Sequence, residues 1–584
     1  MPLNLNQLTP YLSVIVLKIS NDSFNINSLF ENLALNARNI QISTHSSGAI
    51  IYFKNYVENK KVSWTDDNNI VDRINHLMIV FKIDNYLAIY HSDNSKKNFI
   101  YKFIFRGNLE HEFKKLRLIR KEVLNAAFIN NVKVKNLWLN NIDKSSDLKA
   151  DSKVLSGKNL EEALDPLGDS NYTFSALKVE MGDESIGINT SDSKVWTKKY
   201  SDSDEYFDSL EILLNSIKDC DINNNLNFDP IRTLSNSHND ITQLNSIIDI
   251  QLSNIESFDP QSDEYNLLNN IVHLWDNWNF IYTKVGDTFI IEIFDGTINN
   301  NEIARLGIRL FDNLEIIIVK AIISSEIEDT YNLQKVFENK NIIKFWFDNN
   351  YSLINGSIFK QKFRDVSFNK FKWTNFPNID VSKEKPTSLS LIGQEDSLFC
   401  WVKKYWRGEE NNLVDITQQF VRGWLLCDDG SNEKADFIHI SNETIPTISF
   451  IHAKGANSNT NSRNLSTTAY EVVISQAIKN LRYVDKNLLS ETIDISPNNN
   501  VANLVWLNGN QETRINFKNH LNSLTTYKKR VVVLQPHLIR YKFENYNNTP
   551  TNRNRINQLN TLFVSTQITI QSLGAEFVVI GDDL

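Results

Sequence analysis

Three side chains that can bind cations or anions follow apolar segments between residues 423 and 456: Asp436, His452 and Lys454. The whole segment reads GWLLCDDGSNEKADFIHISNETIPTISFIHAKGA. A carboxylate such as that of Asp436 suits Mg²⁺, a hard ion that prefers oxygen ligands, whereas an imidazole is better suited to Mn²⁺. The first chemistry that these residue types indicate is therefore the binding of a divalent metal ion.

Short apolar strands separated by turn sequences must position these residues. We predict strands at 424–427, 435–440 and 447–454, joined by the turns DDGSNE and SNETIP. Because side chains alternate along a strand, His452 and Lys454 share one face. In the predicted hairpin, Asp436 lies roughly opposite Ala453 and close to Lys454. One sheet face then carries Asp, His and Lys at its open end, and such groups need partners because the burial of unpaired charge is costly.

An amphipathic helix is predicted after the third strand. The segment STTAYEVVISQAIKNLR begins with a capping box of Thr468 and Glu471 and has an apolar stripe that can pack on the sheet. Gln476 lies beside this stripe. Further strands are predicted at ANLVWLNG, KRVVVLQPHL and AEFVVIGDD, with a helix around residues 553–573. The last third of the chain is thus predicted to run strand, strand, strand, helix, strand.

This pattern resembles the core of the PD-(D/E)xK, or restriction-endonuclease-like, nucleases. Asp436 matches the metal-binding Asp of that family, and Lys454 matches the Lys that positions the attacking water and the scissile phosphate. The resemblance implies a catalytic set of Asp436, Lys454, His452 and Gln476, in which Gln476 helps to position Lys454 or the substrate. It also implies Mg²⁺ or Mn²⁺ as the cofactor and hydrolysis of phosphodiester bonds as the reaction.

Two positions depart from the family pattern. Ala435 stands where the family often has Pro, and His452 stands where it has the acid of the acid-x-Lys motif. His452 would then be a weak metal ligand or a proton acceptor. Glu433 can supply the missing carboxylate beside Asp436 as a metal ligand, or it can be a solvated turn residue. Further candidates for an acidic ligand are Asp428, Asp429 and, from an upstream segment, Glu395.

Length and element pattern predict an α+β multidomain protein. A chain of 584 residues exceeds the size of a single hydrophobic core. We predict an α+β domain at 1–200, a middle domain at 201–385 that is helical and then a β-meander, and a restriction-endonuclease-like α/β domain at 386–584. Residues 240–255, DITQLNSIIDIQLSNI, are predicted to be helical. The charged segment at 377–387, which contains two prolines, is predicted to be a linker.

Composition indicates a cytoplasmic protein without membrane segments. The three cysteines are widely separated, the start lacks signal-peptide features, and the apolar runs are too short to span a membrane. The net charge of −9 argues mildly against a surface that binds nucleic acid throughout, but it allows a local basic cleft. Arg463 is a candidate nucleic-acid contact or a solvated loop charge. Since the chain has no P-loop, a separate helicase, ATPase or sensor chain is the expected partner.

The sequence therefore predicts a metal-dependent endonuclease that cuts DNA or RNA, with DNA favoured. Its layout is similar to that of effectors of bacterial restriction and anti-phage defence, in which the N-terminal region would sense or recruit. Two alternatives stay open. One is a catalytically degenerate nuclease fold that binds nucleic acid or serves as a scaffold of a defence complex, and the other is a toxin-like RNase. His452 is the position that bears most on this choice, because the family expects an acid there.

Overall fold

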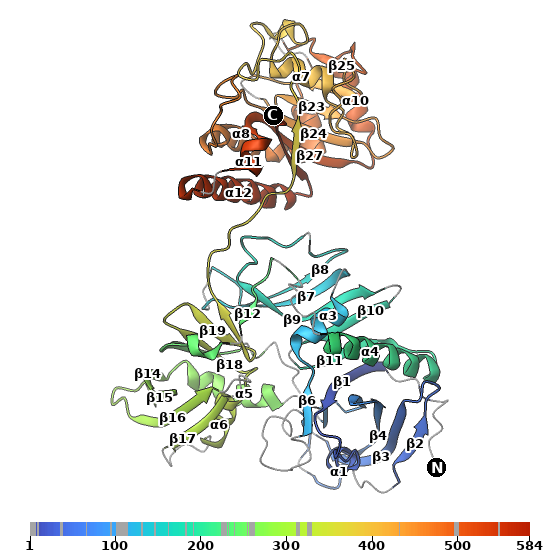
Figure 1. The fold of residues 1–584 in the computed structure, drawn as a ribbon, viewed down its shortest axis with the longest axis vertical. Helices are drawn as coiled ribbons and strands as arrows, with labels where there is room; N and C mark the ends of the chain where they lie inside the picture. The colour runs from blue at the N-terminus through green and yellow to red at the C-terminus, as the bar shows by residue number, and fades with distance from the viewer. Residues whose placement is uncertain are drawn as a thin grey trace. The chain divides into compact units, whose positions relative to one another are not determined.

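The computed structural model divides into two compact units, residues 1–363 and residues 364–584, termed unit 1 and unit 2 (Figure 1). The expected α+β multidomain class is observed, since both units combine sheets with helices. No described helix is both long and apolar enough to cross a membrane. The structure describes residue 8 and residues 11–584 without positions 35–38, 63, 66, 94–95, 98, 101–114, 130–131, 145–147, 162, 182–183, 191, 224–230, 232, 239, 254, 256–262, 311–315, 324–329, 431–432, 496–500 and 547–548.

A large antiparallel sheet forms the first part of unit 1. Its order is β2-β3-β4-β5-β1-β11-β10-β9-β7-β8, and β6 pairs with β1. Sequences such as YLSVIVLKI favour strands because β-branched side chains pack well on a pleated surface. The strands are β1 (Tyr11–Ile19), β2 (Gln41–Thr44), β3 (Ile50–Lys61), β4 (Val71–Ile83), β5 (Tyr86–His91), β6 (Leu116–Leu118), β7 (Lys133–Asn141), β8 (Ser152–Ser156), β9 (Tyr172–Met181), β10 (Glu184–Asn189) and β11 (Lys194–Lys199).

Helices pack on this sheet through two separate apolar clusters. Leu29 and Phe30 of one helix join the cluster around Ile15, whereas Tyr206 and Leu210 of another join a second cluster. The helices are α1 (Asn27–Leu33), α3 (Lys121–Phe128) and α4 (Ser203–Asn223). Because α4 is part of the second cluster, unit 1 continues past the domain boundary that the sequence predicts after residue 200.

Two smaller sheets complete unit 1. A five-stranded sheet has the order β12-β20-β19-β18-β13, and β14 to β17 form the predicted meander. The predicted helix at 240–255 is wrong, because residues 247–252 form β13, which pairs with β18, and this strand pairing outweighs the helical spacing. The elements are β12 (Ser237–His238), η3 (Ile241–Gln243), β13 (Ile247–Leu252), α5 (Asp263–Trp275), β14 (Asn279–Val285), β15 (Thr288–Phe294), β16 (Glu302–Leu310), β17 (Ile316–Ile323), α6 (Thr330–Glu338), β18 (Ile343–Phe347), β19 (Tyr351–Ile354) and β20 (Ser357–Lys360).

Unit 2 has one mixed sheet of order β21-β28-β27-β24-β23-β22-β25-β26. The neighbours β21, β28, β27 and β24 are parallel, whereas β23 and β22 are antiparallel to their neighbours. The three strands predicted before a helix are therefore present, and β27 lies parallel beside the third. The strands are β21 (Phe371–Thr374), β22 (Trp424–Cys427), β23 (Phe437–Ile440), β24 (Thr447–Ala453), β25 (Val505–Leu507), β26 (Asn510–Gln511), β27 (Lys528–Ile539) and β28 (Glu576–Asp582).

Helices cover both faces of this sheet (Figure 1). On one face, Phe399 and Trp401 of α7 pack in a cluster with Phe437 and Ile451. On the other face, α8 contacts β24 and β27, and α12 contacts β28. The helices are η5 (Leu389–Leu391), α7 (Leu398–Tyr405), α8 (Thr468–Lys479), η6 (Leu481–Val484), α9 (Lys486–Thr492), α10 (Arg514–Ser523), α11 (Arg540–Glu544) and α12 (Pro550–Gln571). Every residue of β24 is buried as a result.

The segment predicted to be a linker packs inside unit 2, so the boundary predicted at 385/386 differs from the observed one at 363/364. The backbone N–H of Ala456 donates a 2.7 Å hydrogen bond to the carbonyl of Val381. A Cβ on Gly455 would lie only 2.6 Å from the carbonyl oxygen of Ser382. The two backbone segments therefore approach each other so closely that only a glycine fits at this position. The residues just after Ser382 are thereby held at the end of β24.

Candidate functional site

Asp436 lies at the start of β23 and is fixed by the neighbouring strand. The β23–β24 ladder pairs Phe437 with Ile451, which places Asp436 beside the end of β24. The Oδ2 atom of Asp436 accepts a 2.8 Å hydrogen bond from the backbone N–H of Ala453. The ladder thus brings a buried carboxyl group next to Ala453, the residue that precedes Lys454. Continuing the register beyond Phe437 and Ile451 sets Asp436 opposite His452, one residue away from the predicted partner Ala453.

Asp429 and Glu433 join Asp436 in an acidic cluster. Each of the three offers a carboxylate oxygen, and these atoms all lie within 4.8 Å of one another. Burial raises the pKa of Asp436 to about 8, with further increases from Glu433 and Asp429 that the hydrogen bond from Ala453 partly offsets. Burial also raises the pKa of Glu433. Without a cation, Asp436 therefore keeps its proton at neutral pH.

Two lysines and a fourth carboxylate border this cluster. Lys454 Nζ lies 2.7 Å from Glu384 Oε2, and Lys385 Nζ lies 2.7 Å from Asp429 Oδ1 and 3.5 Å from Glu384 Oε1. Burial lowers the pKa of Lys385, but its hydrogen bond to Asp429 and the surrounding acids outweigh burial and raise it overall. The side chains of Lys454 and Lys385 are 42% and 40% exposed, so the cluster is open to solvent on their side.

Glu384 and Lys385 are absent from the predicted site. They lie in the segment predicted to be a linker, and a Glu-Lys pair before a proline gives no signal of its own in the sequence. The acid predicted from an upstream segment, Glu395, is instead exposed and accepts a 2.7 Å hydrogen bond from the backbone N–H of Thr387. Glu384 is therefore the upstream carboxylate that reaches the cluster.

The charges of this site fit a divalent cation. Its four carboxylates and two ammonium groups would leave two negative charges if all were ionised. The protein avoids that state by keeping Asp436 protonated, because a buried charge without a partner is costly. Oxygen-rich ligand sets favour hard ions such as Mg²⁺ and Mn²⁺. The residues present therefore fit the predicted metal, with Asp436, Glu433 and Asp429 as its ligands.

His452 takes no part in this cluster. It is buried among the residues of β24, and burial lowers its pKa to about 3, with a further decrease from Lys479 of α8. The neighbouring charge that affects it is thus a lysine on the helix and not a carboxylate of the cluster. The predicted roles of metal ligand or proton acceptor do not agree with this position.

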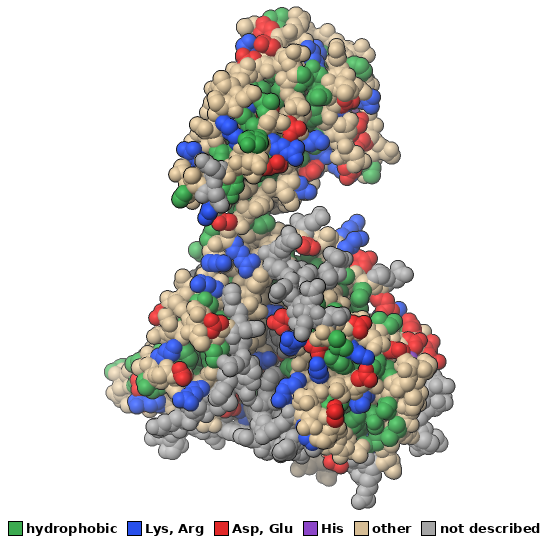
Figure 2. Space-filling view, in the orientation of Figure 1, with side chains coloured by type: hydrophobic (Ala, Val, Ile, Leu, Met, Phe, Trp, Pro, Cys, Tyr) green, Lys and Arg blue, Asp and Glu red, His purple; other side chains and the backbone are tan. Residues whose placement is uncertain are grey.

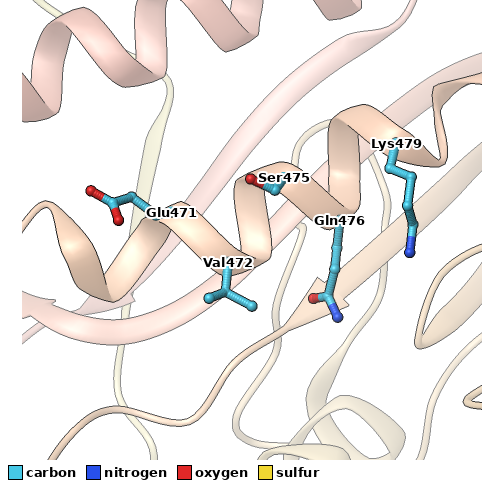
Figure 3. Close-up of a pocket in the computed structure, with 5 residues that line it drawn as sticks. All are labelled: Glu471, Val472, Ser475, Gln476 and Lys479. Carbon is cyan, nitrogen blue, oxygen red and sulfur yellow. The ribbon is translucent and has the colours of Figure 1, made fainter.

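Gln476 lies on α8, in a shallow surface pocket with Glu471, Val472, Ser475 and Lys479 (Figure 3). The side chains of Gln476 and Lys479 extend from the same side of the helix in this view. No hydrogen bond recorded among the described residues joins Gln476 to Lys454 or to a carboxylate of the cluster. The role predicted for Gln476 in positioning Lys454 is therefore not seen in this structure.

Two other predicted residues have structural partners. Arg463, the candidate nucleic-acid contact, is buried, pairs with Asp582 and donates 3.2 Å hydrogen bonds to the carbonyls of Ser458 and Thr460. This burial does not agree with a direct contact to nucleic acid. Asp428, a further candidate ligand, accepts a 3.0 Å hydrogen bond from Arg514 and also lies 3.4 Å from Lys434 Nζ.

Comparisons of the chain with protein-family models, with curated proteins and with solved structures give no match. The interpretation of the site therefore depends on its geometry and chemistry.

Proposed function

We propose that unit 2 is a metal-dependent nuclease that hydrolyses phosphodiester bonds, with the active site formed by Glu384, Asp429, Glu433, Asp436 and Lys454. The observation that carries this proposal is the cluster of three carboxylates within 4.8 Å, with Lys454 linked to it through Glu384. This set supplies the oxygen ligands and the cation that a PD-(D/E)xK site requires. The proposed fold class of unit 2 is accordingly the restriction-endonuclease-like α/β core.

Each residue has a distinct task in this proposal. A divalent ion supplies a Lewis acid and lowers the pKa of a bound water. Asp436, Asp429 and Glu433 would hold this ion, and Asp436 would do so in its deprotonated form. Lys385 holds the Asp429 carboxylate in place through their 2.7 Å ion pair. Lys454, whose side chain is 42% exposed, exchanges Glu384 for a substrate phosphate and orients the attacking water.

The substrate would be DNA or RNA, with DNA favoured. It would bind at the local site around Lys454, because unit 2 does not present a broad basic surface on its visible face (Figure 2). Figure 2 shows positive and negative side chains interspersed on the visible face of unit 2. Since phosphate contacts dominate affinity, such a surface binds nucleic acid weakly without help. We therefore propose that unit 1 or a separate helicase, ATPase or sensor chain delivers the substrate, as in a cytoplasmic anti-phage or restriction system.

The decisive experiment compares the full chain with Lys454→Ala on plasmid DNA and on RNA, with Mg²⁺ or Mn²⁺. Lys528→Ala is the matched control, because Lys528 makes a 2.6 Å ion pair with Glu410 and has 47% side-chain exposure, close to the values for Lys454. We expect cleavage by the wild type and the control and a loss of at least about 100-fold in Lys454→Ala, typical of a group that acts on the transition state. Equal cleavage by all three proteins would rule out the assigned site.

A second candidate function is a degenerate nuclease fold that binds nucleic acid or acts as a scaffold. The observation that favours it is His452, which leaves β24 without the acid expected two residues before Lys454 and is not a member of the cluster. In that case no activator would elicit cleavage, and nucleic acid would still bind to the wild type. RNA cleavage without DNA cleavage would indicate the third possibility, a toxin-like RNase.

A further inference from the structure

A second group of side chains that could bind a metal ion lies in unit 1, on the β3–β4 hairpin of the large sheet beside the end of β5. It consists of Glu58 on β3, His76 on β4 and Asp93, two residues after the end of β5. The ladders pair Tyr56 with His76 and Met78 with His91, so that Glu58, His76 and Asp93 project from the same sheet face. One nitrogen and two carboxylate oxygens of this group lie within 4.8 Å of one another.

The Nε2 atom of His76 is the feature that indicates a ligand. The side chain of His76 is only 6% exposed. Its Nε2 lies 3.2 Å from Glu58 Oε2, but the geometry is not that of a hydrogen bond, and among the described residues this buried atom has no hydrogen-bond partner. A buried polar atom without a hydrogen bond destabilises the fold, so its retention beside two carboxylates needs a cause.

A shared metal ion accounts for this geometry. Two ligand atoms that lie about 2.0–2.2 Å from one tetrahedral ion are separated by roughly 3.3–3.5 Å, and neither needs to point at the other as in a hydrogen bond. The 3.2 Å separation of His76 Nε2 and Glu58 Oε2 is close to this value. A carboxylate oxygen of Asp93 lies within 4.8 Å of both atoms, so Asp93 can serve as the third ligand.

The surroundings hold the ligands in place. His76 Nδ1 lies 3.4 Å from Ser92 Oγ, which orients the ring with Nε2 towards Glu58. The backbone N–H of Asp93 donates a 2.9 Å hydrogen bond to His91 Nδ1, and the other nitrogen of His91 lies 2.9 Å from the hydroxyl of Tyr56. Outer contacts of this kind fix the tautomer and orientation of metal-binding histidines.

We propose that Glu58, His76 and Asp93 form a binding site for a divalent transition-metal ion, with Zn²⁺ as the best match. An imidazole favours such ions over Mg²⁺, and three protein ligands leave one tetrahedral position to water. The ion would link the β3–β4 hairpin to the segment that follows β5. This site is independent of the proposed nuclease function, because it lies in unit 1 and shares no residue with the cluster around Asp436.

The test measures Zn²⁺ binding to the full chain by calorimetry and by metal analysis after dialysis. All samples carry Asp436→Asn, so that the cluster in unit 2 contributes less. His76→Gln and Glu58→Gln are compared with His273→Gln, which changes an exposed histidine on α5. Glu58→Gln guards against misfolding, because the side chain of Glu58 is 25% exposed and tolerates the isosteric change.

We expect His76→Gln and Glu58→Gln to bind Zn²⁺ at least about 10-fold more weakly than the His273→Gln control, since even outer-shell changes cost 10–100-fold. Co²⁺ should give visible absorption bands of a tetrahedral ion in the control and lose them in both variants. Equal Zn²⁺ affinity and stoichiometry in all three proteins, with circular dichroism showing intact folds, would overturn the proposal.

Discussion

His452 provides the sharpest test of how the resemblance to PD-(D/E)xK nucleases applies to this chain. If it were a ligand or a proton acceptor, His452→Gln would abolish cleavage. The structure instead buries it on β24, where Lys479 of α8 affects its pKa, and it is not among the residues that form the acidic cluster. We therefore expect His452→Gln to retain metal-dependent cleavage within a few-fold of the wild type and to change the response of stability to acid.

The size of the acid effect follows from the pKa of His452. Burial lowers it to about 3 in the folded protein, against about 6.5 in the unfolded chain. Between these values the unfolded state binds the proton and the folded state does not, so stability falls as the pH decreases through this window. From about pH 7.5 to about pH 5 the histidine costs the wild type about 2 kcal/mol of unfolding free energy. His452→Gln removes this cost.

Urea unfolding of the full chain at several pH values measures the effect. The difference in stability between His452→Gln and the wild type should shift by about 2 kcal/mol in favour of the variant as the pH falls from about 7.5 to about 5. His439, whose pKa burial lowers to about 4, titrates in both proteins and cancels. His273→Gln, at an exposed position, should follow the wild type. Parallel pH curves for His452→Gln and the wild type, or a loss of cleavage in a folded variant, would refute the reasoning.

Two other substitutions separate structural from catalytic roles. With a chelator present at neutral pH, Asp436→Asn should be more stable than the wild type by about 4 kcal/mol, because the carboxyl group keeps its proton up to about pH 8 in the folded protein but loses it near pH 3.8 in the unfolded chain. This gain in stability should disappear below about pH 3.5. Thermal unfolding of both proteins at a series of pH values would measure the difference in their stability. Arg463→Met should destabilise the protein by about 3–5 kcal/mol in urea, since it leaves Asp582 buried without its partner. At low temperature, gel-shift assays of folded Arg463→Met should show unchanged affinity for DNA.

The sequence predicts the part of the site that depends on local strand geometry. The turns around Asp429 and Pro446 delimit β22, β23 and β24, and the pairing of β23 with β24 brings Asp436 to the backbone of Ala453. Glu433 follows from its position in the same turn. These residues are separated by at most one hairpin, so the pairing of adjacent strands determines their arrangement.

Residues that reach the site from distant segments could not be predicted in this way. Glu384 lies far from Lys454 in the chain, and its position depends on the contact of Gly455 with Ser382, which no periodic pattern encodes. Arg463 appears as a polar loop residue because its partner Asp582 lies 119 residues away. The helix predicted at 240–255 failed for the same reason, since β18, the partner of β13, lies far along the chain.

The residue two positions before Lys454 and the position of Glu384 bear on one another. β24 carries His452 where the PD-(D/E)xK pattern has an acid, and the carboxylates of the cluster come from Asp436 and from the turn after β22. Glu384 pairs with Lys454, so this lysine still has a carboxylate beside it. If unit 2 is the proposed nuclease, its metal site would not need the strand acid, because a metal ion depends on where oxygen atoms lie and not on which segment carries them.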